Sequence, residues 1–195
     1  MLNFAKVITF VFIFALHFKS EAQVTSGFWS TGCQNGLKKE QIYGHNNRVI
    51  TTESFYQDKK CIDESFRFQT IGFVSYYSSE SYSTSETFID FLYEEIFLTV
   101  FKQNVISDFN SRKVCGYTDW ARTEAQNITG LKCAVFNLNS PTKIPSAGEI
   151  KYGIFQSTEG KLYYGKLTQE LNASSPEKRP NQINIQTEYL FQLKK

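Results

Sequence analysis

Apolar and polar residues alternate along three segments of the chain, and this alternation predicts β-strands more strongly than any other feature. Successive side chains of a strand point to opposite faces, so each segment is expected to have one buried and one wetter face. The three apolar faces are Phe66, Phe68, Val74 and Tyr76; Ile150, Tyr152 and Ile154; and Ile183, Ile185, Tyr189, Phe191 and Leu193.

Composition also favours strands, because the 195-residue chain has 18 Phe and 11 Tyr beside a single Met. Segment 86–101 fits a helical stripe or a pair of strands, and its β-branched residues favour the pair. One short helix is predicted near 118–126, where Thr118 can cap the first turn. Many short strands with one inserted helix predict a mainly β fold, an antiparallel β-barrel or strongly curved sheet, in one domain.

The first 22 residues are predicted to be a cleaved signal peptide. Lys6 precedes the apolar run 7–16, and Ser20 and Ala22 put small residues where a signal peptidase cuts. The run is shorter than the roughly 20 apolar residues that a spanning helix needs, and no later segment is long and apolar enough to be one. The expected mature domain is therefore 23–195, secreted or periplasmic after cleavage near Ala22.

Four cysteines lie in the predicted mature chain, and an even count after a signal peptide indicates disulfides. Of the three possible pairings we favour Cys33–Cys61 and Cys115–Cys133, because each closes a short segment between neighbouring strands. A metal site is not expected, since the sequence has no C-x-x-C pair and the mature chain has one histidine, His45. Asn127 and Asn172 match the glycosylation sequon, which has meaning only in some kingdoms of life.

Several functional classes are disfavoured by what the sequence lacks. Lys+Arg total 21 and Asp+Glu 19, so no strongly basic character points to a nucleic acid. A Ser-His or Cys-His nucleophile would have to use His45, which lies in a turn-like Gly-His-Asn-Asn stretch. The adjacent carboxylates Glu94 and Glu95 would point to opposite faces of a strand. We therefore expect no enzymatic activity and no cofactor.

The order of several short motifs carries a resemblance to a known family. The segments are Gly27-Phe28-Trp29-Ser30-Thr31-Gly32-Cys33, Phe55-Tyr56-Gln57-Asp58-Lys59-Lys60-Cys61, Cys115-Gly116-Tyr117-Thr118-Asp119-Trp120, Tyr152-Gly153-Ile154-Phe155 and Leu162-Tyr163-Tyr164-Gly165. Over most of 26–192 the chain resembles the domain of the adenomatosis polyposis coli down-regulated family, lipid-binding antagonists of Wnt signalling. Animal members carry two such domains and extra cysteines, so this chain resembles a single-domain microbial relative.

The resemblance implies a lipocalin-like barrel that binds a lipid or acyl chain inside. A barrel of about eight strands can hold one small ligand when side chains do not fill its interior. Because the net charge is small, we expect ligand charge to matter little. The predicted ligand-contacting residues, on the faces expected to point inward, are Phe66, Phe68, Ile150, Tyr152 and Ile154.

Four residues are assigned structural roles. Gly27 and Trp29 are similar to the entrance strand of lipocalins, in which a Trp closes the bottom of the barrel. By the same analogy Arg179 is expected to stack on Trp29. Substitution of Trp29 by Ala is expected to destabilise the protein more than substitution of Trp120 by Ala. Trp120 is expected to dock the predicted helix on the barrel.

Two functions remain open. The first is a secreted carrier or sensor of a hydrophobic small molecule or lipid. The second is an envelope or surface protein whose barrel core is filled and whose protein partners bind outside. An apolar cavity of about 300 Å³ or more would favour the carrier, and a filled interior would favour the surface protein.

Overall fold

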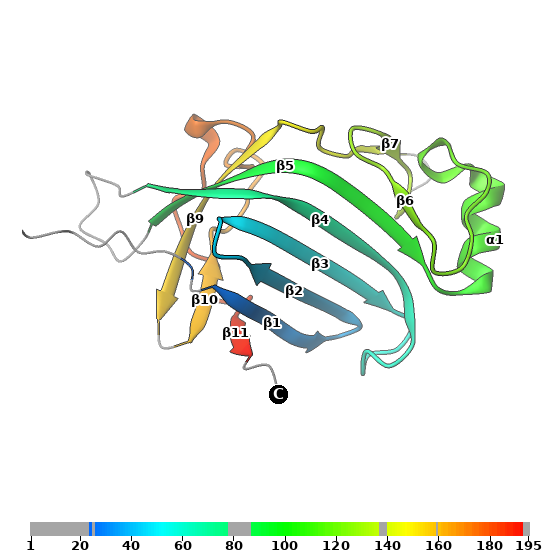
Figure 1. Cartoon of the computed structure of the whole chain (residues 1–195), viewed down its shortest axis with the longest axis horizontal. Helices are drawn as coiled ribbons and strands as arrows, with labels where there is room; N and C mark the ends of the chain where they lie inside the picture. The colour runs from blue at the N-terminus through cyan, green and yellow to red at the C-terminus, as the bar shows by residue number, and fades with distance from the viewer. Residues whose placement is uncertain (1–23, 25, 78–86, 137–139, 159, 193–195) are drawn as a thin grey trace, which may run out of the picture.

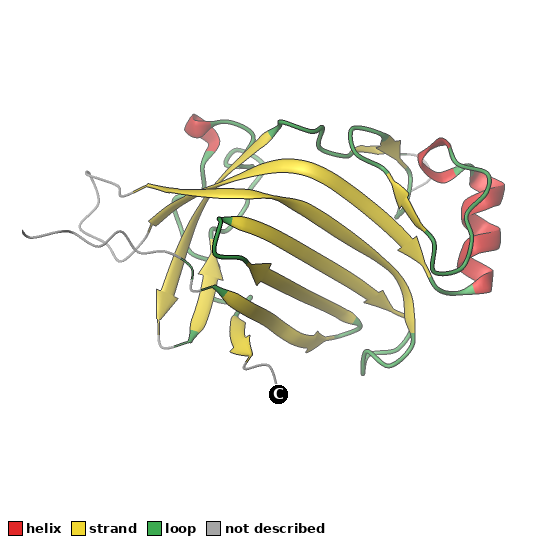
Figure 2. Cartoon of the chain, in the orientation of Figure 1, coloured by secondary structure: helices red, strands yellow, loops and turns green. Residues whose placement is uncertain are grey.

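The structure is a computed structural model that describes residues 24, 26–77, 87–136, 140–158 and 160–192. Strands dominate these residues, and α1 (Gln103–Arg112) is the one α-helix among them (Figures 1 and 2). No helix in the described part of the chain is long and apolar enough to cross a membrane. The strands are β1 (Gly27–Gln34), β2 (Leu37–Tyr43), β3 (Arg48–Tyr56), β4 (Glu64–Tyr77), β5 (Thr87–Val100), β6 (Ala125–Asn127), β7 (Lys132–Cys133), β8 (Thr142–Lys143), β9 (Ile150–Thr158), β10 (Lys161–Tyr164) and β11 (Tyr189–Gln192).

Eight antiparallel strands close into a barrel, as the sequence predicted. The order is β1-β2-β3-β4-β5-β9-β10-β11, and β11 pairs with β1 to complete the ring. Consecutive strands β1 to β5 form one half of the wall, and β9 to β11 form the other half (Figure 1). Closure leaves every barrel strand with a partner on both sides, which removes exposed sheet edges from this part of the molecule.

Within the segment 86–101, for which a pair of strands was predicted, Thr87–Val100 form the single long strand β5. Its first half pairs with β9 and its second half with β6, while β4 pairs with it along its whole length. A register shift between Ile71 and Gly72 bends this pair of strands. A Cβ atom at Gly72 would overlap the carbonyl oxygen of Leu92, so the close approach of the two backbones requires glycine there.

The helix is present, but the predicted position near 118–126 is wrong. Helix α1 instead follows β5 and buries Ile106 and Phe109, which are three residues apart and so share a face. Residues 125–127 form β6, because pairing with β5 outweighs their helix propensity. Trp120 lies in the loop before β6, where the Asn110 side chain accepts from its backbone N–H at 2.7 Å and donates to its C=O at 3.0 Å.

The apolar core has two parts. One lies at the closed end of the barrel, and the other lies between α1 and the far halves of β4 and β5. The first consists of Val24, Trp29, Tyr43, Val49, Val74, Ile89, Phe155, Leu162 and Tyr189. The second includes Ile96, Leu98, Val100, Ile106, Phe109, Val114, Trp120 and Ile128.

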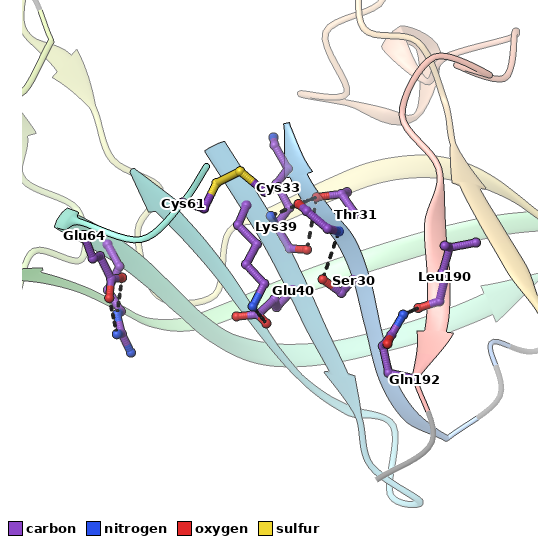
Figure 3. A network of polar contacts seen from close by, with 12 residues as sticks. Ser30, Thr31, Cys33, Lys39, Glu40, Cys61, Glu64, Leu190 and Gln192 are labelled. Carbon is purple, nitrogen blue, oxygen red and sulfur yellow. Dashed lines mark hydrogen bonds and ion pairs between the residues drawn. A yellow bond between two sulfur atoms is a disulfide. The ribbon is translucent and has the colours of Figure 1, made fainter. Parts of the chain in front are cut away.

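Both predicted disulfides are confirmed. The Sγ atoms are 2.06 Å apart in Cys33–Cys61 and 2.02 Å apart in Cys115–Cys133, and no cysteine is free. Figure 3 shows the first bond beside an irregular stretch of β1, where the Thr31 hydroxyl accepts from the Lys39 backbone N–H at 3.1 Å. The bond ties the end of β1 to the β3–β4 loop. In the chain-entropy model each bond contributes about 3 kcal/mol.

The three alternating segments differ in outcome. The face containing Phe66 and Val74 belongs to β4, as predicted, and points inward. Residues 150–154 belong to β9, but their inward face is the opposite one, as described below. Of 183–192 only Tyr189–Gln192 is a strand; Ile183 makes an isolated bridge to Gly165, and Ile185 is 78% exposed. The predicted Leu193 lies outside the described residues. Residues 183–188 have no neighbouring strand along their length, so they do not form a strand despite their alternating pattern.

Candidate functional site: the barrel cavity

A cavity of about 530 Å³ lies inside the barrel. Most of its wall comes from the inward-facing residues of the surrounding strands, and some neighbouring residues such as Glu40, Thr52 and Leu92 also border it. Segment 165–187, between β10 and β11, completes the lining where those strands are short. The inward residues from the strands include Lys39, Gln41, Val49, Thr51, Glu53, Thr70, Phe91, Tyr93, Lys151, Gly153, Tyr164 and Tyr189.

Aromatic rings close the cavity at one end. Trp29 is 1% exposed and packs edge-to-face against Phe191, with 5.1 Å between ring centroids. A Cβ atom at Gly27 would lie 2.6 Å from the Phe191 ring, so the glycine leaves room for this contact. Tyr164 packs edge-to-face on Tyr189 at 5.4 Å. Packed aromatic rings therefore close this end of the cavity, and a ligand would have to enter from the other end.

Polar groups at this closed end satisfy one another. The hydroxyls of Tyr43 and Tyr164 hydrogen-bond to each other, and the Tyr164 hydroxyl donates to Gln41 Oε1 at 2.5 Å. Burial raises the pKa of both phenols well above the ordinary value. Burial also raises the pKa of Tyr93, on the cavity wall, to about 12. These phenols are neutral hydrogen-bonding groups at physiological pH.

Charged residues also line the cavity. Lys39 Nζ is 2.9 Å from Glu53 Oε1, and the two side chains are 30% and 43% exposed. Lys151, on the neighbouring wall, is partly buried and pairs in register with Phe91 of β5. Burial lowers the pKa of Lys151, an effect opposed by the charge of Glu53 and reinforced by that of Lys39. The cavity therefore combines aromatic walls with charged side chains, of which Lys39 and Glu53 are the more exposed and Lys151 is partly buried.

The structure places the predicted residues Phe66 and Phe68 outside this cavity. They share the inward face of β4 with Thr70, but lie at the end of β4 where β5 pairs with β6 in place of β9. Helix α1 covers that face, and the two rings pack among Phe55, Phe109 and Phe136. Phe68 borders a smaller hollow of about 190 Å³ beside the cavity. Both residues therefore stabilise the contact between α1 and the sheet.

The predicted inward orientation is wrong for Ile150 and Tyr152. Ile150 is 38% exposed, and Tyr152 lies under the Arg179 guanidinium on the outer face of β9. Ile154 is buried beneath segment 165–180 and borders the cavity. Lys151, Gly153 and Phe155 form the inward face. The outer face of β9 is apolar because a loop covers it, so an apolar stripe did not identify the interior.

Arg179 also differs from its expected place on Trp29. Its guanidinium lies over the rings of Phe88 and Tyr152, with 4.4 Å and 5.4 Å to the centroids, on the outside of the barrel wall. It also donates to the Gly153 carbonyl at 2.6 Å. Arg179 therefore fastens segment 165–188 to the outer faces of β5 and β9.

Sequence reasoning missed the polar residues of the cavity, chiefly Lys151, Lys39 and Glu53. Lys151 lies between the predicted apolar positions Ile150 and Tyr152, so it was expected on the wetter face, and no face was predicted for Lys39 or Glu53. In the antiparallel register of β3 and β4, Glu53 lies opposite Phe68 and therefore on the same face as Thr70. The sequence alone does not show which face of β9 points into the barrel.

Comparison of the sequence with protein-family models gives no match, and comparison with curated proteins gives none either. The assignment of function therefore rests on the geometry of the barrel.

Proposed function

We propose that this protein is a secreted, non-enzymatic carrier or sensor that binds one hydrophobic or amphipathic molecule inside its barrel. The cavity carries the proposal, because its volume of about 530 Å³ falls in the range of small-molecule sites, roughly 300–1,000 Å³. A barrel filled by side chains, which the surface-protein alternative requires, would leave no such space.

The lining supports a ligand with an apolar body. Phe91, Tyr93 and Tyr164 present ring surface to the cavity, and Val49 adds an aliphatic contact. Each buried methylene of a ligand contributes about 0.8 kcal/mol, so affinity is expected to rise with chain length until the cavity is full. The proposal agrees with the resemblance to the lipid-binding domain family described above.

The disulfides also support secretion. Both cysteine pairs are bridged, and structural disulfides belong to oxidising compartments. The predicted signal peptide, residues 1–22, lies outside the described residues and remains a prediction.

The test is titration with N-phenylnaphthylamine, a neutral dye that brightens in apolar surroundings, with and without a blocked cavity. Thr70 and Thr51 pair across β4 and β3 and both line the cavity, so Thr70→Trp and Thr51→Phe would fill it. Ser75→Trp is the matched control, because Ser75 is exposed on the outer face of β4.

The proposal predicts saturable brightening with wild type and Ser75→Trp, and its loss in whichever blocked variant keeps the wild-type circular dichroism spectrum. It is overturned if folded wild type shows no saturable signal, or if a folded blocked variant binds as well as wild type.

A further inference from the structure

We propose that the ligand is a single-chain amphiphile with a carboxylate headgroup, and that the ammonium group of Lys151 holds this headgroup inside the cavity. This inference rests on the proposed function and specifies its ligand. Its basis is that only some of the charged side chains that line the cavity have a partner of opposite charge.

Two of the cavity cations have no carboxylate partner. Lys39 Nζ pairs with Glu53 Oε1 at 2.9 Å, and Glu40 pairs with Lys38 at 2.5 Å. Neither of the other two lining cations, Lys151 and Lys166, has a carboxylate oxygen within 4.0 Å in the part of the chain that the structure describes. The lining therefore carries an excess of positive charge.

Lys151 and Lys166 differ in their access to water. Lys166 is exposed, so water already solvates its ammonium and an ion pair there would contribute little. Lys151 is partly buried on β9, beside the aromatic wall formed by Phe91. A cation that is withdrawn from water without a counter-charge is costly, and an incoming carboxylate would remove that cost.

The surroundings of Lys151 favour one negative charge on an apolar chain over a free inorganic anion. Phe91 and Tyr164, whose ring centroids are 6.1 Å apart, line the space beside Lys151 and suit a hydrocarbon. Glu53 also lines the cavity, and its charge would repel a second negative charge on the headgroup. A monocarboxylate with a flexible chain meets both conditions.

The test compares decanoic acid with decanol by titration calorimetry near neutral pH, where the acid is ionised. The two ligands share a chain and differ in headgroup charge. Wild type is expected to bind decanoic acid at least about tenfold more tightly than decanol. This is the gain in affinity typical of a charge-assisted hydrogen bond. Lys151→Met, of similar length but neutral, should reduce acid affinity to the level of the alcohol.

Two controls accompany this variant. Lys151→Arg retains the charge and should keep the preference for the acid. Lys132→Met removes an exposed lysine on β7, which does not line the cavity, and should bind both ligands like wild type.

The outcomes separate this inference from the proposed function. If wild type and Lys151→Met bind acid and alcohol equally well, the cavity binds a ligand but the headgroup assignment is overturned. If the preference for acid persists in folded Lys151→Met, another group holds the carboxylate and the inference again fails. If folded wild type binds neither ligand, the proposed function itself fails.

Discussion

Arg179 and Asp90 form an ion pair on the outer wall of the barrel, with 2.7 Å between Nη1 and Oδ1. The two side chains are 12% and 15% exposed, so the pair is largely shielded from water. Asp90 Oδ1 accepts no hydrogen bond of good geometry from the described residues, so the ion pair is what offsets its burial. Through this pair the segment between β10 and β11 is attached to β5.

Removing Arg179 should therefore be costly. Arg179→Met is expected to lower the free energy of unfolding by about 3 kcal/mol, because it leaves the Asp90 carboxylate buried without a counter-charge. Urea denaturation measures this loss. Adding Asp90→Leu to Arg179→Met should recover most of it, since an apolar pair needs no counter-charge. A double variant no more stable than Arg179→Met would contradict this account.

The two tryptophans should be similarly important. Trp29 is 1% and Trp120 2% exposed, and each packs in one part of the core, so each substitution by Ala should cost about 3–5 kcal/mol. This replaces the expectation from the sequence that Trp29 matters more. Ile185→Ala, at a 78% exposed side chain, is the control and should be nearly neutral in thermal denaturation. A Trp120 variant with wild-type stability would show that α1 packs independently of it.

Asp58 should make the fold sensitive to acid. Its carboxylate accepts from the Asp63 N–H at 2.7 Å and from the Lys60 N–H at 2.7 Å, and these hydrogen bonds, the first foremost, lower its pKa. The carboxylate therefore stabilises the fold above the unfolded-state pKa of about 3.9, and this contribution is lost as pH falls through the lower folded-state pKa.

The measurement is stability against pH for wild type and Asp58→Asn. The variant should be less stable at neutral pH, and the difference should shrink in acid. Asp119→Asn, at an exposed carboxylate, should follow wild type. A difference between wild type and Asp58→Asn that stays constant down to acid pH would mean that ionisation of Asp58 is not what stabilises the loop.

Binding of a carboxylate ligand should weaken at high pH. Burial lowers the pKa of Lys151, so this ammonium loses its proton at a lower pH than an ordinary lysine, whose pKa is about 10.4. Decanoic acid affinity should fall in wild type as the pH rises through this lowered pKa, before an ordinary lysine titrates, and should stay flat in Lys151→Met over the same range. Calorimetry at several pH values measures both. The other ionisable residues that line the cavity are Lys39, Glu40, Glu53, Tyr93, Tyr164, Lys166 and Tyr189.

An equal fall in both proteins would assign the pH dependence to one of these other groups. Decanol supplies a second control, because its affinity should not follow the ionisation of Lys151.

The barrel and both disulfides could be predicted because they depend on local patterns. The alternating residues 66–76 form β4, and each cysteine pairs with its predicted neighbour along the chain. The helix was misplaced because Ala125 and its neighbours have helical propensity but pair with β5, and long-range pairing outweighs propensity.

The cavity could not be predicted from hydrophobicity. At β9 the apolar residues Ile150 and Tyr152 are outside and Lys151 is inside, so the rule that the apolar face is internal fails where the interior is a cavity with polar lining residues. Net charge was equally uninformative. It sums to +2 over the chain and does not reveal an unpaired Lys151 in the cavity.

The most direct test of the account is native mass spectrometry of the folded protein equilibrated with decanoic acid. The central claim is that one cavity holds one amphiphile, so the spectrum should saturate at one ligand per chain, and Thr70→Trp should carry none. A wild-type protein that stays free of ligand, or that gains several ligands without saturation in both wild type and Thr70→Trp, would contradict it.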